Sequence, residues 1–426
     1  MARGIPMRHL RAWALLAAAA CLAAGPAGAR LLIPMDLTQS DHLKAYGVAF
    51  RCLERGQSVE WLLNYRGGSF LVEATETTRR DLLLEGVGFE AVSGSDEAQI
   101  YDAVENNNME VVLLEKAPKV AVYTPPAVEP WDDAVTLALD YAKIPFDKIW
   151  DEEVLSGKLG QYDWLHLHHE DFTGQYGKFY GAFQTAKWYR DRQELYETRA
   201  RQAGYAKVWQ HKHAVTNRIK EYIAQGGFLF AMCSATDTFD IAQAAGDTDI
   251  VDRFYDGDPP EAGCQNKLDF SRTLVFENFI LEMNPLVYEY SDIDMSDYSA
   301  VRGPEADYFT LFDFSAKEDP VPTMLTQNHV NVINGFMGQT TTFNRVRIKP
   351  STILLAEVEG TDEVKYVHGN YGKGTVTFYG GHDPEDYQHQ VGDPPTQLDL
   401  HKNSPGYRLI LNNILFPAAQ KKERKT

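Results

Sequence analysis

The chain has 426 residues, of which 44% are hydrophobic and 24% are charged, and it contains 32 Gly and 20 Pro. This composition is typical of a globular protein with roughly two or three domains and excludes a disordered, collagen-like or coiled-coil chain. The 41 Lys and Arg residues against 60 Asp and Glu residues give a formal net charge of -19. We therefore do not expect nucleic acid as a partner, because phosphate binding requires a basic surface.

The first 29 residues follow the plan of a secretory signal peptide. Three arginines precede an apolar run over 12–24, and the small residues at 27–29 predict cleavage after Ala29. An alternative is a lipoprotein anchored through Cys21. The run is shorter than the ~20 apolar residues of a membrane helix, and no later segment reaches that length. We expect an exported protein, periplasmic or secreted, without a transmembrane segment.

After this leader the chain alternates between predicted strands and helices. A first series fills the segment 30–117, where Ser40 is the expected N-cap of the first helix. Its strands are expected at 31–33, 59–63, 89–92 and 111–114, and its helices at 41–53, 77–84 and 96–104. This pattern predicts a small N-terminal α/β domain.

A second series occupies 118–426. Strands are expected at 120–123, 163–168, 228–232, 353–356, 364–368 and 375–379, and helices at 131–142, at 188–225 and from 404 onward. The region from about 247 to 326 lacks this alternation and is interpreted as an insertion of loops and short strands. The near-continuous apolar strands predict an α/β fold with an open, mostly parallel sheet and flanking helices on both faces.

Cleavage of the leader leaves three cysteines, Cys52, Cys233 and Cys264. An odd number allows one disulfide at most within the chain, so at least one thiol stays free or pairs outside it. The sequence leaves open whether Cys52 pairs with Cys264. The absence of a close CxxC pair excludes a zinc ribbon or a thioredoxin-type motif.

Polar residues follow three of the predicted strands at their carboxyl ends, where open α/β sheets bind ligands. The three segments are His-His-Glu-Asp at 168–171, Cys-Ser-Ala at 233–235 and Gly-Gly-His-Asp-Pro-Glu-Asp at 380–386. Because the carboxyl ends of parallel strands share one edge of a sheet, we expect these segments to form one site.

Cys233 is the candidate nucleophile. A nucleophile elbow is a tight strand-to-helix turn that needs small residues two places before and two places after the nucleophile, and Ala231 and Ala235 occupy these places. We expect the amino end of the following helix to lower the pKa of the thiol. The alternative is that Cys233 is a small buried residue of the core.

His382 is the candidate base for this thiol, with Glu385 or Asp383 as the carboxylate that orients its ring. The alternative is a loop histidine in an acidic turn.

A second cluster comprises His166, His168, His169 and Glu170. On a strand, His166 and His168 project to the same face, and two imidazoles with a nearby carboxylate or thiolate are common zinc ligands. His382 or Cys233 would complete a tetrahedral set. Alternatively, these residues and Asp383 bind a substrate carboxylate or glycan hydroxyls, or the histidines satisfy buried hydrogen bonds.

From Lys119 onward the order of elements resembles the class I glutamine amidotransferase-like fold, in which a Cys elbow follows a central strand and a His follows a late strand. Nearly the whole mature chain also resembles an exported bacterial family commonly labelled asparagine synthetase B. The matching segments are WLLNYRGGSF at 61–70, WDDAVTL at 131–137, WLHLHHEDFTGQYGKF at 164–179, FLFAMCSAT at 228–236 and GGHDPEDYQH at 380–389.

This resemblance implies the amidotransferase-like fold and a site around Cys233 and His382. The usual orienting Glu of that superfamily lies two residues after the His, where this chain has Pro384, and Glu385 follows one place later. ATP-dependent asparagine synthesis is not expected, because Ala2 stands where a nucleophilic N-terminal Cys is required and the SGGxDS loop is absent.

These observations together predict an exported hydrolase or acyl-transfer enzyme that uses Cys233 on an amide-like small molecule or peptide. Two alternatives stay open. One is a non-catalytic envelope protein that binds glycan or peptide, and the other is a metal-dependent hydrolase.

Overall fold

The computed structural model describes residues 30–127, 129–321, 324, 328–388 and 390–419. The predicted leader, its cleavage site and Cys21 lie outside these residues. Within the described ranges, no helix combines the length and the apolar character needed to cross a membrane. The three cysteines that follow the leader are buried and free of disulfides.

The N-terminal part of the chain forms a five-stranded antiparallel sheet with three helices. Its elements are β1 (Arg30–Ile33), α2 (His42–Glu54), β2 (Val59–Leu63), β3 (Ser69–Glu73), α3 (Glu76–Glu85), β4 (Glu90–Val92), α4 (Gly94–Asn106) and β5 (Glu110–Leu114). The strand order is β4-β1-β3-β2-β5. The sequence did not predict β3, which begins directly after the turn at 66–68.

The expected N-cap of α2 is wrong by one residue. The Oδ1 atom of Asp41 accepts the backbone N–H of Lys44 at 2.9 Å, whereas the Ser40 hydroxyl donates to the carbonyl oxygen of Gly86 at 2.7 Å. Asp and Ser are equally good N-caps, so the hydrogen bond of Ser40 to Gly86 explains why Asp41 and not Ser40 caps α2.

The rest of the chain forms a ten-stranded mixed sheet in the order β11-β10-β13-β14-β15-β9-β8-β6-β7, with β12 paired to β14. These strands are β6 (Val120–Tyr123), β7 (Asp147–Ile149), β8 (Trp164–Leu167), β9 (Phe228–Met232), β10 (Tyr308–Leu311), β11 (Val332–Asn334), β12 (Phe343–Asn344), β13 (Ile353–Glu357), β14 (Glu363–Tyr371) and β15 (Gly374–Tyr379). The neighbours β7, β6, β8, β9 and β15 are parallel, and the remaining pairs are antiparallel. The predicted α/β class is confirmed, and the region 247–326 supplies one strand of this sheet, β10.

Helices cover both faces of the larger sheet. The helices described in this part of the chain are α5 (Ala134–Ala142), α6 (Asp151–Leu155), α7 (Tyr180–Phe183), α8 (Lys187–Gln202), α9 (Val208–Gln225), α10 (Ala235–Ala245), α11 (Arg253–Asp256), α12 (Ser296–Arg302) and α14 (Pro405–Leu415). One face packs against α5 and α14, and the other against α9 and α10. Ser404 caps α14 as the sequence predicted, accepting the N–H of Tyr407 at 3.3 Å.

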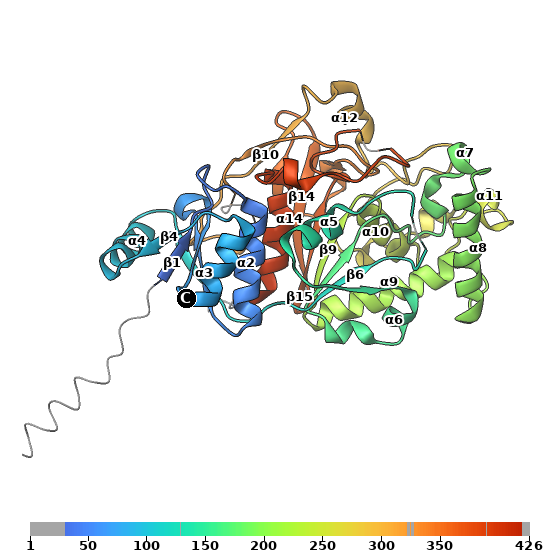
Figure 1. Cartoon of the computed structure of the whole chain (residues 1–426). Coiled ribbons are helices and arrows are strands. Elements are labelled where there is room, and N and C mark those ends of the chain that lie inside the picture. Colours follow the sequence, from blue (N-terminus) through green and yellow to red (C-terminus); the bar gives the residue numbers. More distant parts are fainter. Residues whose placement is uncertain (1–29, 128, 322–323, 325–327, 389, 420–426) are drawn as a thin grey trace, which may run out of the picture.

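The two sheets share one hydrophobic core. Figure 1 shows α2 between the small sheet and α14, and Val48 of α2 belongs to the same buried cluster as Leu139 of α5 and Ile414 of α14. The close approach of α2 to α5 requires Gly47, where an added Cβ would lie 1.8 Å from the carbonyl oxygen of Ala142. The N-terminal sheet is therefore packed firmly on the larger one.

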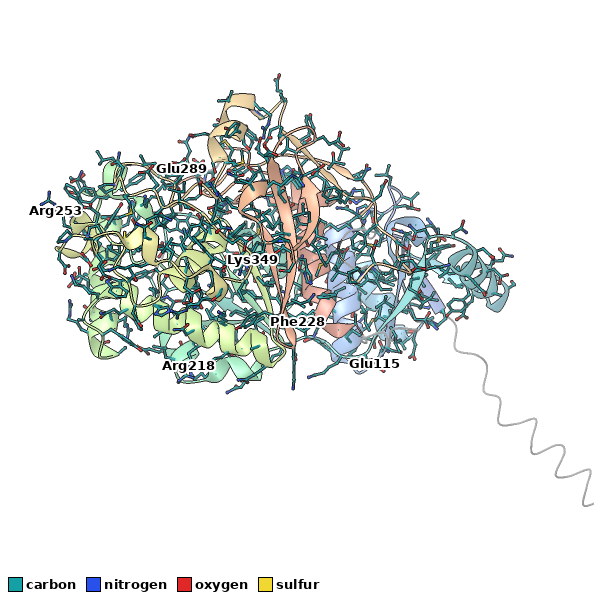
Figure 2. All side chains as sticks on the ribbon, turned by 180° about the vertical axis from the view of Figure 1, so that it is seen from behind. Glu115, Arg218, Phe228, Arg253, Glu289 and Lys349 are labelled. Atoms are coloured by element: carbon teal, nitrogen blue, oxygen red, sulfur yellow. The ribbon has the colours of Figure 1, made fainter. Side chains whose placement is uncertain are left out.

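The alternation of β8 determines which side chains reach the site. Leu165 and Leu167 belong to the core on the α9 face, and Trp164 belongs to the core on the α5 face. His166 has the parity of Trp164 and so points toward α5. Phe228, labelled in Figure 2, marks the amino end of the parallel strands, so the candidate site lies at the opposite end of β9.

Candidate functional site

The structure brings together the three segments that follow β8, β9 and β15. The rings of His168 and His169 stack with centroids 3.7 Å apart, and the ring of His382 lies 4.8 Å from the first and 4.3 Å from the second. The backbone N–H of Cys233 donates to the carbonyl oxygen of Gly381 at 3.2 Å. The expected juxtaposition of the thiol with these histidines is therefore present.

Cys233 has an unusual backbone. It lies between β9 and α10 with a φ of +52°, in the left-handed region that non-glycine residues rarely adopt. Ala231 and Ala235 are fully buried on either side of it. A strained residue at a strand-to-helix turn, flanked by small side chains, is the geometry of a nucleophile elbow.

The thiol of Cys233 is closed off from solvent, with 3% of the residue exposed. Burial raises its pKa to about 12, although hydrogen bonds from the backbone N–H groups of Ser234 and Gln339 act in the opposite direction. The carboxyl groups of Asp237 and Asp294 raise it further. The expected lowering of this pKa by the helix is therefore wrong, because desolvation outweighs the backbone donors.

The two stacked histidines approach the thiol. One ring nitrogen of His168, one of His169 and the sulfur of Cys233 lie within 4.8 Å of one another. The Nε2 atom of His169 lies 2.9 Å from the carbonyl oxygen of Asp132, which can only accept a hydrogen bond. This contact places the proton of a neutral His169 ring on Nε2 and the lone pair on Nδ1.

A carboxylate that the sequence reasoning missed contacts this cluster. The Oδ2 atom of Asp133 lies 3.1 Å from Nε2 of His166 and 3.2 Å from Nδ1 of His168. Its Oδ1 atom accepts the first N–H groups of α5, so the carboxylate is also the N-cap of that helix. Although burial acts in the opposite direction, the two imidazoles hold the pKa of Asp133 well below its usual range.

The available sequence signal for Asp133 was its position. The helix expected at 131–142 includes Asp133, whereas α5 begins at Ala134, and Asp is a preferred N-cap. An N-cap carboxylate on a helix that follows β6 lies at the carboxyl edge of the sheet, beside the end of β8.

The two carboxylates expected to orient His382 contact the C-terminal helix region. Glu385 lies 2.9 Å from Nδ1 of His401, and Asp383 accepts the hydroxyl of Tyr407 at 2.6 Å and the N–H of Glu385 at 2.9 Å. These contacts anchor the turn after His382 to the segment around α14. Asp133 is the carboxylate that contacts His166 and His168.

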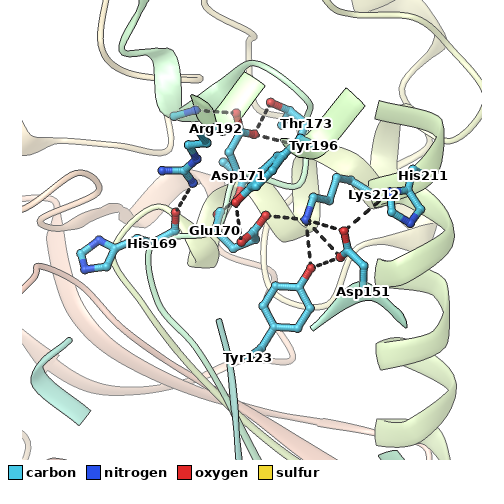
Figure 3. A network of polar contacts seen from close by, with 12 residues as sticks. Tyr123, Asp151, His169, Glu170, Asp171, Thr173, Arg192, Tyr196, His211 and Lys212 are labelled. Carbon is cyan, nitrogen blue, oxygen red and sulfur yellow. Dashed lines mark hydrogen bonds and ion pairs between the residues drawn. The ribbon is translucent and has the colours of Figure 1, made fainter. Parts of the chain in front are cut away.

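Glu170 belongs to a different group of buried side chains. Its Oε1 atom lies 2.6 Å from Nζ of Lys212, which also lies 3.1 Å from both carboxylate oxygens of Asp151 and 3.0 Å from the hydroxyl of Tyr123. Figure 3 shows the Glu170 carboxylate directed to Lys212, away from the ring of His169. Burial raises the pKa of Glu170 to about 7. The expectation that Glu170 joins the histidines is wrong, because its carboxylate pairs with the buried ammonium of Lys212.

Two pockets of the protein lie away from Cys233 and the histidines. One of about 490 Å³ is lined by residues that include Asp36 and His329, and one of about 470 Å³ by residues that include Glu385 and His401. Neither is lined by Cys233 or by His168. In the cluster around the thiol, His168, Cys233 and His382 are buried and His169 is partly exposed.

Comparisons with known proteins give only distant likenesses. No protein-family model and no curated protein matches the sequence. Among solved structures, the chain is similar to the cytoplasmic proteins STM3548 and STM1381 of Salmonella typhimurium, at 13% and 12% identity, covering 71% of this chain and 100% of each of theirs with TM-scores of 0.33. It is also similar to a catalytic mutant of Gan42B, a GH42 beta-galactosidase from G. stearothermophilus, at 12% identity over 62% of this chain and 28% of that one, with a TM-score of 0.25. The case for a function rests on the geometry of the cluster itself.

Proposed function

We propose that this protein is an exported hydrolase or acyl-transfer enzyme that acts on an amide-like substrate through Cys233. The observation that carries the proposal is the left-handed backbone of Cys233 at the turn between β9 and α10. Strain of this kind persists where the surrounding structure enforces it, and such residues cluster at active sites. The resemblance to the class I glutamine amidotransferase-like fold and to the family labelled asparagine synthetase B supports the same residue.

The backbone donors around the sulfur suit the charge that develops in acyl transfer. The N–H groups of Ser234 and Gln339 donate to the Cys233 sulfur. In nucleophile elbows the residue after the nucleophile supplies one oxyanion donor, and a neighbouring loop supplies another. Ser234 and Gln339 fit these two roles, which stabilise the negative oxygen of a tetrahedral intermediate.

We assign His169 to accept the thiol proton, since one of its ring nitrogens lies within 4.8 Å of the Cys233 sulfur. Its tautomer is fixed by the Asp132 carbonyl, which leaves Nδ1 as the basic nitrogen, and its backbone carbonyl is held by the Arg192 guanidinium at 3.3 Å. His382, the base expected from the sequence, packs against the His169 ring and limits its movement.

The chemical steps balance within this set of groups. The Cys233 proton passes to Nδ1 of His169, and the sulfur bonds to the substrate carbonyl carbon. The carbon–nitrogen bond breaks, and the imidazolium returns the proton to the leaving amine. Water then cleaves the thioester, or an acceptor amine takes the acyl group, which restores the thiol.

The test is turnover of a panel of primary and N-substituted amides, measured as release of ammonia or amine. A Cys52→Ala/Cys264→Ala variant keeps Cys233 as the single thiol after the leader and should retain activity. In that background, Cys233→Ala should abolish turnover, and mass spectrometry should trap an acyl group on Cys233 in the parent. Turnover by the Cys233→Ala variant would overturn the proposal. Ligand binding without any turnover, unaffected by iodoacetamide, would instead favour a binding protein.

A further inference from the structure

Three donor atoms converge beside the proposed nucleophile. They are Nε2 of His166, Nδ1 of His168 and Oδ2 of Asp133, and one donor atom from each of these residues lies within 4.8 Å of the others. The carboxylate oxygen lies 3.1 Å from the first nitrogen and 3.2 Å from the second. Both histidines are almost fully buried, at 0% and 2% exposed. We propose that Asp133, His166 and His168 bind a divalent first-row transition-metal ion, of which Zn²⁺ is the representative.

The hydrogen bonds of the two ring nitrogens of His166 favour a cation between this ring and Asp133. Its Nδ1 atom lies 3.2 Å from the carbonyl oxygen of Phe230 and must therefore carry a proton. In a neutral ring the Nε2 atom then presents a lone pair to the negative Asp133 oxygen. Two electron-rich atoms at 3.1 Å need a positive charge between them, which a second proton or a metal ion supplies.

His168 distinguishes these two sources. Its Nδ1 atom lies 3.2 Å from the same Asp133 oxygen, yet it lacks the alignment of a hydrogen bond, and Nε2 of this buried ring also makes no hydrogen bond within the described part of the chain. A proton on His166 would leave this ring unsatisfied. A metal ion shared by the three donors would satisfy Nε2 of His166, Nδ1 of His168 and the carboxylate at once.

The spacing of the donors fits tetrahedral coordination. With metal–ligand distances of about 2.0–2.1 Å, two ligands of a tetrahedral zinc ion lie about 3.3 Å apart. The 3.1 and 3.2 Å separations from Asp133 match this value closely. Two imidazoles and one carboxylate form a donor set that suits zinc and its first-row neighbours, and imidazole nitrogen disfavours Ca²⁺ and Mg²⁺.

The surroundings hold two of these ligands in place. Metal-bound histidines commonly donate their second N–H to a backbone carbonyl, as His166 does to Phe230. The Oδ1 atom of Asp133 is fixed by the N–H groups of Val135 and Thr136 at 2.8 and 2.9 Å. The burial of His166 and His168 also suits an ion, which needs far less space than an organic ligand.

A second set of donors, His168, His169 and Cys233, shares one residue with the proposed site. This set has no carboxylate, its two rings stack face to face, and burial favours the neutral thiol. We therefore assign the ion to the Asp133 set. The assignment does not require Cys233 to be a nucleophile.

The experiment measures metal binding without any substrate. The purified full-length mature protein is stripped with a chelator and titrated with Zn²⁺ in competition with a chromophoric indicator, and the Co²⁺ form is recorded by absorption. We expect one equivalent per chain and a Co²⁺ spectrum without a thiolate charge-transfer band. Asp133→Asn, which retains a good N-cap, and His168→Gln should each weaken Zn²⁺ binding more than about 100-fold, beyond the effect of losing an outer-shell partner.

Two further variants locate the ion and control for folding. Cys233→Ala should leave Zn²⁺ affinity within about threefold of the parent, and His368→Phe, which alters a buried histidine elsewhere in the sheet, should do the same. Circular dichroism must show a folded protein for each variant used. Loss of binding in Cys233→Ala but not in Asp133→Asn would place the ion on the other set and overturn the assignment. Absence of stoichiometric Zn²⁺ binding by the folded parent would also overturn it, whereas the amide turnover test reports separately on the proposed function.

Discussion

The backbone N–H of Cys233 donates a hydrogen bond to the carbonyl oxygen of Gly381 at 3.2 Å. This bond joins the loop that carries the thiol to the loop that carries His382. Gly381 has a φ of +87°, and an added Cβ would lie 2.6 Å from the ring of Phe336. The position of the thiol relative to the histidines therefore depends on a residue without a side chain.

Gly381→Ala should lower both stability and any activity that depends on Cys233. The left-handed backbone costs an alanine about 1–2 kcal/mol, and the collision with Phe336 adds about 1–3 kcal/mol. Gly360→Ala is the matched control, because Gly360 has a φ of +74° and no atom lies within 4 Å of its added Cβ. Urea unfolding of both variants should show the larger loss for Gly381→Ala. Equal losses would mean that the loop adjusts freely around Phe336.

Because the backbone of Cys233 is strained, we expect the Cys233→Gly and Cys233→Ala variants to differ in stability. Glycine adopts a φ of +52° without cost, whereas alanine keeps most of the penalty of the native residue. Cys233→Gly should therefore be more stable than Cys233→Ala by about 1 kcal/mol. In the helical interior of α10 the order should reverse, with Ala242→Gly less stable than the parent by about 1 kcal/mol. A Cys233→Gly variant that is the less stable of the pair would contradict the assigned backbone strain.

The next prediction concerns the contribution of the buried Lys212 ammonium to the stability of the protein. Figure 3 shows it between the carboxylates of Asp151 and Glu170, and both Lys212 and Asp151 are at most 1% exposed. Lys212→Met should cost about 3–5 kcal/mol, because the carboxylates then remain buried without their cation. Adding Glu170→Gln should recover part of this loss. Chemical denaturation measures both changes, and Lys187→Met, at a side chain that is 84% exposed, should have no measurable effect.

A Lys212→Met protein with the stability of the parent would show that the carboxylates become protonated or hydrated at little cost. The pKa of Glu170, already raised to about 7 by burial, makes proton uptake the first of these to check. Lys212 lowers this pKa, so its removal raises the pKa of Glu170 further. Repeating the unfolding experiment at increasing pH separates the two explanations, because a stability that depends on protonation falls as the pH rises, whereas one that depends on hydration does not.

The sequence predicted most of the α/β elements because buried strands are short apolar runs. The expected strands at 59–63 and 228–232 match β2 and β9 residue for residue. The strands that were missed include β3, which begins directly after the turn at 66–68 and pairs with β2 and β1, and β11, a three-residue edge strand that pairs with β10. Their strand character comes from tertiary contacts that local periodicity does not report.

The candidate site was predicted in part. Strand ends correctly grouped Cys233 with His168, His169 and His382, because parallel strands bring their carboxyl ends to one edge. The carboxylate of Asp133 was missed, because it lies in the loop after β6, far in sequence from His166 and His168, whereas the orientation of His382 by Glu385 or Asp383 stays a prediction. The thiol pKa was also misjudged, because a helix terminus is visible in sequence whereas desolvation depends on the whole fold.

His368 gives the stability of the protein a specific dependence on pH. Its ring is fully buried in β14, with Nδ1 2.8 Å from the hydroxyl of Thr377, and burial lowers its pKa to about 4. In the unfolded chain a histidine has a pKa of about 6.5. The unfolded state therefore binds the additional proton between these two values, and this contribution to the free energy of unfolding falls by up to about 1.4 kcal/mol per pH unit as the pH drops from about 6.5 to about 4.

His368→Phe keeps an aromatic ring next to Phe416 and removes this titration. Urea unfolding at several pH values between 7 and 4 should therefore show a shallower decline of stability for the variant than for the parent. Thr377→Val is the matched control, because it removes the hydrogen-bond partner but leaves the titrating ring buried, so its decline should remain as steep as that of the parent. If His368→Phe and the parent decline in parallel, the proton taken up on acid unfolding belongs to another group.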